Sequence, residues 1–201
     1  MNENCLITQG YEIDGCVKDN TGGLAKIYIA NFKDITGVTY GGSYTGSTFN
    51  QEMVTDIDFI SGGTFYTIDL TKQTSSVTES LTVSVENGTL SYSPVITLVI
   101  NKMQTETRNL LKMMATGLLM GIVQDQNEKL WLLGVKNGLD VTATENTSGV
   151  ALGDRNGYTI TITGIEPQPM VELYSKIYDA EAPFEVVNGQ ILLNSVAISS
   201  Y

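Results

Sequence analysis

Apolar and polar residues alternate along much of the chain, which is the pattern of β-strands that bury one face and expose the other. Residues 24–32, 54–60, 65–70 and 92–100 show it most clearly. Shorter stretches of the same kind predict further strands over residues 119–124, 129–135, 138–144, 158–163, 171–178 and 190–198. The pattern therefore predicts about ten short strands.

Residues 79–86 give the cleanest alternation, and they assign each side chain to a face. We expect Leu81, Val83 and Val85 to be buried on one side of this strand. The other side carries Thr82, Ser84 and Glu86, which we expect to face water. Asn87-Gly88 follows directly and is the strongest short-range signal for a hairpin, with residues 92–100 as the partner strand.

Two other segments between strands have the composition of turns and loops. Ser61-Gly62-Gly63 separates two alternating segments and predicts a hairpin between them. Residues 37–50 are rich in Gly, Ser, Thr and Tyr and are expected to form a loop.

The periodicity changes to that of a helix over residues 105–118, where Leu110, Leu111, Met114 and Leu118 share one face. Thr105 is the expected N-cap, Gly117 or Gly121 marks the end, and core packing is expected for the methionines at 113 and 114. Strands with one flanking helix predict a mainly β fold, a β-sandwich or barrel. The length of 201 residues fits a single domain over 1–201, with residues 165–201 as C-terminal strands or an extension.

Composition narrows the function. The chain has no histidine, so Ser-His-Asp or Cys-His catalysis and histidine metal sites are excluded. Its formal net charge of −11 disfavours a protein that grips nucleic acid through Lys and Arg. Residues 1–13 lack a basic start and an apolar stretch, so we expect no secretory signal and two reduced cysteines, Cys5 and Cys16. We expect the protein to have no enzymatic activity and to bind neither a cofactor nor a metal ion.

Four features have a chemical interpretation, and each has a plainer one. Residues 41–48 have the spacing of a phosphate loop, but Ser47 stands where lysine is required, which favours a flexible loop. Asp56 and Asp58 share a strand face and are expected to be solvated rather than catalytic. Residues 154–157 lack the spacing of a calcium loop and are expected to form a polar turn. Trp131 lies in an apolar run, which favours core packing over sugar stacking.

Three stretches of sequence resemble phage major tail proteins, the subunits of the tail tube, of phages that infect Bacteroidetes. The first is residues 15–32, and the second joins residues 99–103 to the helical residues 106–112. The third runs through residues 121–125, 132–134, 137–139 and 153–164. These are strand, turn and helix patterns without a catalytic signature.

The resemblance implies a structural virion protein that assembles into stacked, six-fold rings around a hollow lumen through which DNA passes. The implied partners are other copies of the chain, the tail tip, the tape measure and the terminator, and a sheath where the tail has one. The implied location is the virion tail, assembled in the bacterial cytoplasm. Thr82, Ser84 and Glu86 are the candidate lumen-facing residues, and residues 37–63 are the candidate inter-subunit arm.

An acidic lumen would repel phosphates and let a duplex slide, which agrees with the net charge. Two alternatives remain at this point. One is another phage tail or head-completion protein of the same fold. The other is a carbohydrate-binding β-sandwich module that uses Trp131 and the aromatic residues of 37–44.

Overall fold

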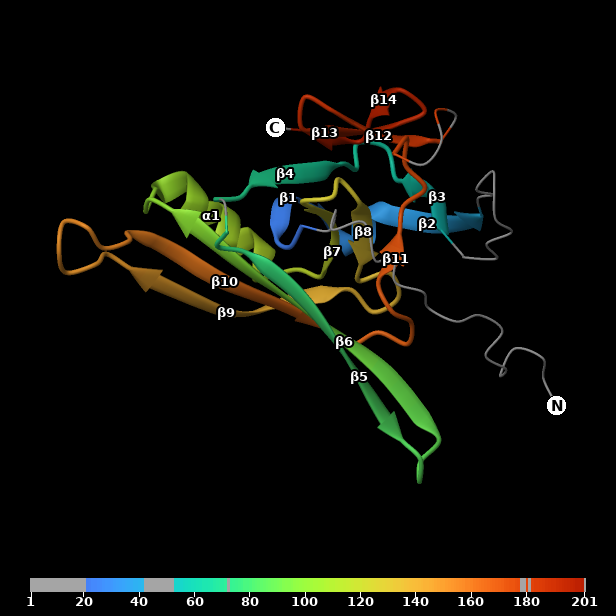
Figure 1. Cartoon of the computed structure of the whole chain (residues 1–201), viewed down its shortest axis with the longest axis horizontal. Helices are drawn as coiled ribbons and strands as arrows, with labels where there is room; N and C mark the ends of the chain where they lie inside the picture. Colours follow the sequence, from blue (N-terminus) through green and yellow to red (C-terminus); the bar gives the residue numbers. More distant parts are fainter. Residues whose placement is uncertain (1–20, 42–52, 72, 178–179, 181, 201) are drawn as a thin grey trace, which may run out of the picture.

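A computed structural model describes residues 21–41, 53–71, 73–177, 180 and 182–200. The fold is mainly β, as predicted, with sheets stacked in the manner of a sandwich or barrel and, in the described part of the chain, one α-helix (Figure 1). That helix is α1 (Thr105–Met114), and a short 3-10 turn, η2 (Phe32–Asp34), follows the first strand.

Most strands belong to one large sheet. Its order is β15 (Ser199–Ser200), β4 (Phe65–Asp69), β1 (Leu24–Asn31), β7 (Leu119–Asp125), β9 (Leu139–Thr147), β10 (Gly157–Gly164), β6 (Thr89–Asn101) and β5 (Ser76–Ser84). The second edge of β7 also pairs with β8 (Leu130–Leu133), which in turn pairs with β11 (Val171–Glu172). Two smaller sheets contain β2 (Ile35–Gly41) with β3 (Met53–Phe59), and β12 (Phe184–Val187) with β13 (Gln190–Leu193) and β14 (Val196–Ala197).

The large sheet folds over at the junction of β7 and β9. These two strands share a single register pair, Leu119 with Leu139, whereas β10 pairs along its whole length with both β9 and β6. The first core cluster fills the space between the two halves. It joins Ile27 and Val123 of one half to Leu98 and Ile160 of the other, and Leu111 of α1 packs into it.

The second core cluster lies on the opposite face of β1 and β7. Tyr28 and Ile122 project from these strands into it, because neighbouring strand positions point to opposite faces. Val54 of β3, Leu173 and Phe184 of β12 cover them. Part of the candidate arm, residues 53–59, and much of segment 165–201 therefore pack on the same body as the central strands.

Several predicted elements are confirmed. Strands form over the expected apolar-polar repeats, and β5 and β6 make the predicted hairpin, with Ser84 paired to Thr89 around a four-residue turn. Gly88 in that turn has a φ of 62°, which a glycine adopts without strain. The polar turn predicted over residues 154–157 lies slightly earlier, since the Asp154 N–H donates to the Ala151 carbonyl (3.0 Å) and β10 already begins at Gly157.

Other predictions are wrong. Gly62 does lie in a turn, but β3 pairs with β2 and β4 pairs with β1, so no hairpin joins β3 to β4. Residues 37–41 belong to strand β2 instead of a loop, and the strand predicted over 171–178 is only the two-residue β11. The helix ends at Met114, and Gln104, not Thr105, is its N-cap. The last helical turn closes with Thr116, whose backbone N–H and side-chain hydroxyl both donate to the Met113 carbonyl.

Candidate functional surface

The strands β9, β10, β6 and β5 form an antiparallel layer that we call the outer sheet, and both of its long edges are open. Within the described residues, β5 pairs only with β6. Past the corner at Leu139, β9 pairs only with β10. Figure 1 shows this layer as long paired strands that reach away from the rest of the fold on either side. Backbone groups along both edges are thus available to another strand.

The register identifies which backbone groups point outward. The N–H of Tyr92 donates to the Glu166 carbonyl (2.8 Å) and the Glu166 N–H donates to the Tyr92 carbonyl (2.7 Å). The backbone N–H and C=O groups of even-numbered β6 residues therefore form hydrogen bonds with β10, and those of odd-numbered β6 residues form them with β5. Through the strand register, Leu81 and Val83 of β5 and Thr144 of β9 direct their N–H and C=O groups to the open edges.

The β5 edge has few of the features that usually block pairing. It contains neither proline nor lysine, and its register with β6 runs without a bulge. Its one charged residue, Glu79, accepts a hydrogen bond from the Met170 N–H at 2.8 Å. Burial raises the pKa of Glu79, and the bond from Met170 opposes that rise. The Glu79 side chain is therefore bonded to the segment before β11. No other position of β5 carries a charge that would oppose pairing with another strand.

One face of the outer sheet is covered mainly with hydroxyl groups. The buried residues Ile96, Leu98 and Ile160 point to the core, so the alternate positions point to the other side. That side, the hydroxyl face, carries Ser76, Thr78, Ser80, Thr82, Ser84, Thr89, Ser91, Ser93, Thr97, Thr147, Thr159, Thr161 and Thr163. All thirteen are at least partly accessible to solvent.

Charged groups are sparse on the hydroxyl face. Asp140 and Glu145 project from β9, beside Thr163 and Thr159 in the register. The guanidinium of Arg155 reaches the end of the sheet where Glu145 lies, and there it donates to the Thr159 hydroxyl (2.7 Å) and the Tyr158 carbonyl (3.3 Å). The described strand positions of this face thus hold two carboxylates, and one cation lies at the rim.

Of the three candidate lumen residues, Thr82 and Ser84 lie on the hydroxyl face. Glu86 does not share it, because β5 ends at Ser84 and Glu86 lies in the turn. The alternation over residues 79–86 gave no sign that β6, β9 and β10 share this face. The threonines at 159, 161 and 163 gave a usable signal, since they alternate with buried isoleucines and a tyrosine.

The expected burial of the opposite side of β5 is wrong. Leu81 is 53% exposed, Val83 55% and Val85 90%. The end of the β5–β6 hairpin reaches away from the rest of the fold (Figure 1), and the first core cluster includes no residue of 81–90, so these side chains point to the core side without core residues beneath them. Leu90 of β6, paired with Val83, is similarly exposed.

The loop between β9 and β10 lies at the opposite end of the outer sheet. Asp154 accepts backbone hydrogen bonds from Ala151 (2.7 Å) and Val150 (2.8 Å), and these bonds lower the pKa of its carboxyl group. Asn156 ties the loop to the start of the α1 segment by accepting hydrogen bonds from the N–H groups of Lys102 and Met103.

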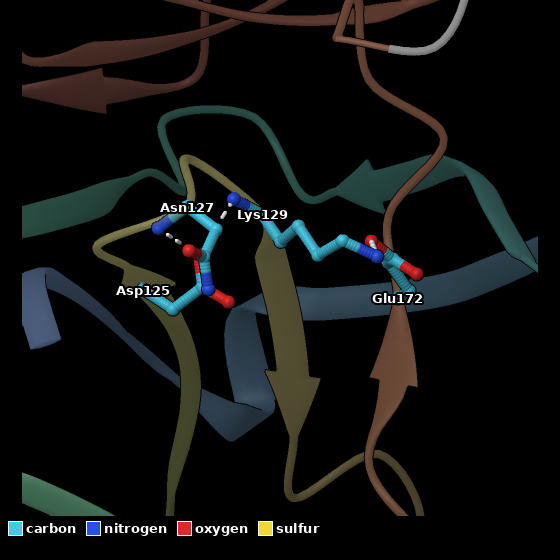
Figure 2. A network of polar contacts seen from close by, with 4 residues as sticks. All are labelled: Asp125, Asn127, Lys129 and Glu172. Carbon is cyan, nitrogen blue, oxygen red and sulfur yellow. Dashed lines mark hydrogen bonds and ion pairs between the residues drawn. The ribbon is translucent and has the colours of Figure 1, made fainter. Parts of the chain in front are cut away.

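The turn between β7 and β8 is held by polar contacts that Figure 2 shows in close view. Asp125 Oδ1 accepts the N–H groups of Asn127 (2.8 Å) and Lys129 (2.9 Å), and Lys129 Nζ lies 3.3 Å from Glu172 Oε1 on β11. The same ammonium group lies 6.0 Å from the centre of the Trp131 ring. The turn therefore helps to position Trp131, the side chain that the sugar-binding alternative requires.

Trp131 is half-buried, so its predicted core packing is only partly realised. It lines a pocket of about 290 Å³ with Leu24, Val77 and Met170. The phosphate-loop candidate at 41–48 begins at Gly41, the last residue of β2, and its remaining residues 42–48 lie outside the described part of the chain, as do Cys5 and Cys16. Asp56 and Asp58 stand on β3 opposite Thr39 and Gly37.

Within the described ranges, no three Cys, Asp or Glu side chains gather as metal ligands would. The same ranges contain no helix with the length and apolar content of a membrane span. Comparison with protein-family models, curated protein sequences and solved structures finds no match for this chain.

Proposed function

We propose that the protein is a structural, non-enzymatic subunit of a phage tail tube, which assembles into rings around a DNA conduit. The observation that carries the proposal is the outer sheet with two open edges. Its four strands alternate in direction, so β5 and β9 run opposite ways. When a second copy is rotated about a common axis, its β9 therefore lies antiparallel to β5 of the first, as a continuous antiparallel sheet requires.

Such head-to-tail pairing is heterologous and closes into a ring when the rotation divides a full turn. Closure removes both open edges of the outer sheet at once, which a single chain cannot do. In this arrangement the hydroxyl face lines the bore, because the opposite side of the sheet carries the core and α1. Hydroxyl groups with few cations offer passing phosphates no strong attachment. The tail tip, tape measure and terminator proteins are the further partners proposed.

Proline substitutions at outward-pointing positions test the pairing directly. Leu81→Pro blocks the β5 edge and Thr144→Pro blocks the β9 edge, and neither removes a ladder bond inside the chain. We expect each variant alone to be monomeric at concentrations where the wild type assembles. Mixed together, the two retain one intact β9 edge and one intact β5 edge, so they should form a heterodimer and nothing larger.

Leu81→Ala and Thr144→Ala keep the backbone N–H and serve as matched controls that should assemble. The measurement is light scattering coupled to size exclusion, with negative-stain images of the wild type. A mixture that stays monomeric beside an assembling wild type would overturn edge pairing. A wild type that stays monomeric at high concentration, and also when given the tail-tip complex, would overturn the proposed function.

A further inference from the structure

The register of the outer sheet defines a line of residues that runs straight across its four strands. Ala143 of β9 pairs with Thr161 of β10. Thr161 in turn pairs with Thr97 of β6, and Thr97 pairs with Ser76 of β5. If a second copy continued this line unchanged past the β5 edge, its Ala143 would oppose Ser76. Any other pairing of the two edges shifts the second copy along β5.

The backbone allows only shifts by an even number of residues. Odd-numbered residues of β5, such as Glu79, direct their N–H and C=O groups to the open edge, and so do Thr144 and Asn146 of β9. A hydrogen-bonded ladder needs these outward-pointing groups to face each other. The same condition keeps the hydroxyl face on one side of the joined sheets, because side chains alternate with the same period. An odd shift would break both.

The lengths of the two edges favour one of the even shifts. β5 and β9 each span nine residues. They overlap along nearly their whole length when Thr147 of the next copy opposes Ser76, which places Ala143 opposite Ser80. This pairing is a shift of four residues from Ser76. A smaller shift leaves Thr147 beyond the start of β5, and a larger one leaves the start of β5 unpaired.

The irregular position in β9 fits the same shift. Thr142 is an extra residue, a bulge across which the register with β10 moves by one. Beyond it, odd-numbered residues of β9, beginning with Val141, direct their backbone groups to the open edge. When the bulge lies opposite Ser80, Leu81 meets Val141. The outward-pointing groups therefore still face each other on both sides of the bulge.

The geometry of a closed sheet gives the same shift independently. Strands of a closed sheet are tilted by about 35–45° from its axis, and the tilt fixes the stagger between neighbours. Four strands about 4.8 Å apart are about 19 Å wide, and four residues at about 3.4 Å each give a stagger of about 14 Å. These lengths correspond to a tilt of about 35°. A shift of two residues gives about 20° and a shift of six gives about 47°, both outside the usual range.

We propose that neighbouring subunits pair in this single register, in which residues 76–82 of one copy lie against residues 140–147 of the next and Thr78 opposes Glu145. The inference rests on the proposed function, because it specifies the contact that closes the ring. Each subunit is then staggered by four residues against its neighbour, and the strands of the bore wall run at about 35° to the tube axis.

The cross-strand neighbours in this register are compatible in charge. Past the bulge, Asp140 meets Thr82 on the hydroxyl face, so neither carboxylate of that face meets another acidic residue. On the core side, the exposed Thr144 comes opposite Glu79, whose Oε1 already accepts the Met170 N–H. A hydroxyl group beside this carboxylate supplies a second hydrogen-bond donor. Glu79 is thereby placed at the contact between copies.

Disulfide trapping measures the register directly. In a chain carrying Cys5→Ser and Cys16→Ser, we combine Thr78→Cys with Glu145→Cys. These positions form a pair without backbone hydrogen bonds between them, with Cα atoms about 4.5 Å apart, which a disulfide can bridge. Within one chain β5 and β9 are three strand spacings apart, about 14 Å, so the disulfide has to join two copies. After oxidation we expect a series of covalent oligomers, up to the whole ring, on a non-reducing gel.

Two shifted pairs are the matched controls. Ser76→Cys or Ser80→Cys, each combined with Glu145→Cys, places the Cα atoms about 8 Å apart, so the cross-linked yield should be on the order of tenfold lower. Ser76→Cys with Thr147→Cys is a second pair in the proposed register and should cross-link as strongly as the first. It removes no charge, so it decides the register if variants that lack Glu145 assemble poorly.

The outcomes separate the register from the proposed function. Stronger cross-linking in either shifted pair would overturn the register and leave the rings in place. Rings in which neither in-register pair cross-links would overturn it as well. A wild type that forms no rings in negative-stain images would instead overturn the proposed function, and the register with it.

Discussion

Glu166 should be among the most sensitive positions in the chain, because its buried carboxylate holds the turn before β9. The residue is 5% exposed. Oε2 accepts the N–H of Lys136 (3.0 Å), and Oε1 accepts those of Asn137 (2.9 Å) and Gly138 (3.2 Å). The backbone of Glu166 bonds in both directions with Tyr92 of β6. One residue therefore connects the corner of the large sheet to the outer sheet.

The size of the effect follows from these contacts. A hydrogen bond to a charged group contributes about 1.5–3 kcal/mol net, and bonds to one carboxylate do not add fully. Glu166→Ala removes both acceptor oxygens and so all three hydrogen bonds, and we expect the free energy of unfolding to fall by about 4 kcal/mol. Glu166→Gln keeps Oε1 for Asn137 and Gly138 but turns an amide NH₂ towards the Lys136 N–H, so we expect a loss of about 2 kcal/mol.

Urea unfolding followed by Trp131 fluorescence measures these changes, and thermal melting should show shifts of about 12 °C for the alanine and about 6 °C for the glutamine variant. Glu185→Gln is the matched control. Its carboxylate pairs with Lys176 at 2.7 Å near the surface, so its loss should cost less than about 0.5 kcal/mol. A Glu166→Ala protein within about 1 kcal/mol of the wild type would refute the structural role given to the buried carboxylate.

Three further outcomes are expected. Glu79→Gln should be more stable than the wild type at pH 7, because burial raises the pKa of Glu79 and penalises its charge, and urea titrations should show the stability difference closing as pH falls through the raised pKa towards the ordinary value of 4.5. Trp131→Ala should cost roughly 2 kcal/mol, since the ring is half-buried, whereas normal folding with loss of binding on a glycan array would favour the sugar-binding alternative. Asp140→Lys with Glu145→Lys should leave tubes intact but make them retain duplex DNA in low salt, and tubes that ignore DNA would contradict the proposed bore.

Local patterns in the sequence predicted the elements well, but apart from the β5–β6 hairpin they did not predict which strands pair. Strand alternation reflects the two faces of a strand and is visible in any half-buried one. Which strands pair depends on contacts between distant residues, and the glycines at 62 and 63 illustrate this. The turn is real, yet Val54 of β3 and Phe65 of β4 are both buried in the second core cluster from different sheets. Local turn chemistry carries no information about that choice.

The candidate surface was predicted only in part, because local patterns do not show which strands lie side by side. Alternation correctly placed Thr82 and Ser84 together on a polar face. It could not show that Leu81 and Val83 lack cover, because an apolar face looks the same in sequence whether it meets the chain's own core or another molecule. The open edges are a property of the register between β5, β6, β10 and β9, and no residue type encodes them locally.

The acidic composition and the hydroxyl face have distinct consequences for the proposed conduit. The net charge of −11 led us to expect acidic residues in the bore, yet on the described strands the face holds only Asp140 and Glu145, and Arg155 bonds Thr159, the register partner of Glu145. Screening limits their reach to about 8 Å at physiological salt, so they repel a duplex only where it approaches the wall. Elsewhere the duplex would meet hydrated hydroxyl groups, whose contacts with phosphate exchange readily with water. Easy passage of the duplex would then depend on the scarcity of lysine and arginine in the bore more than on the number of acidic residues. A single cation per subunit recurs around every ring, and each contact between a cation and a phosphate strengthens the binding of DNA.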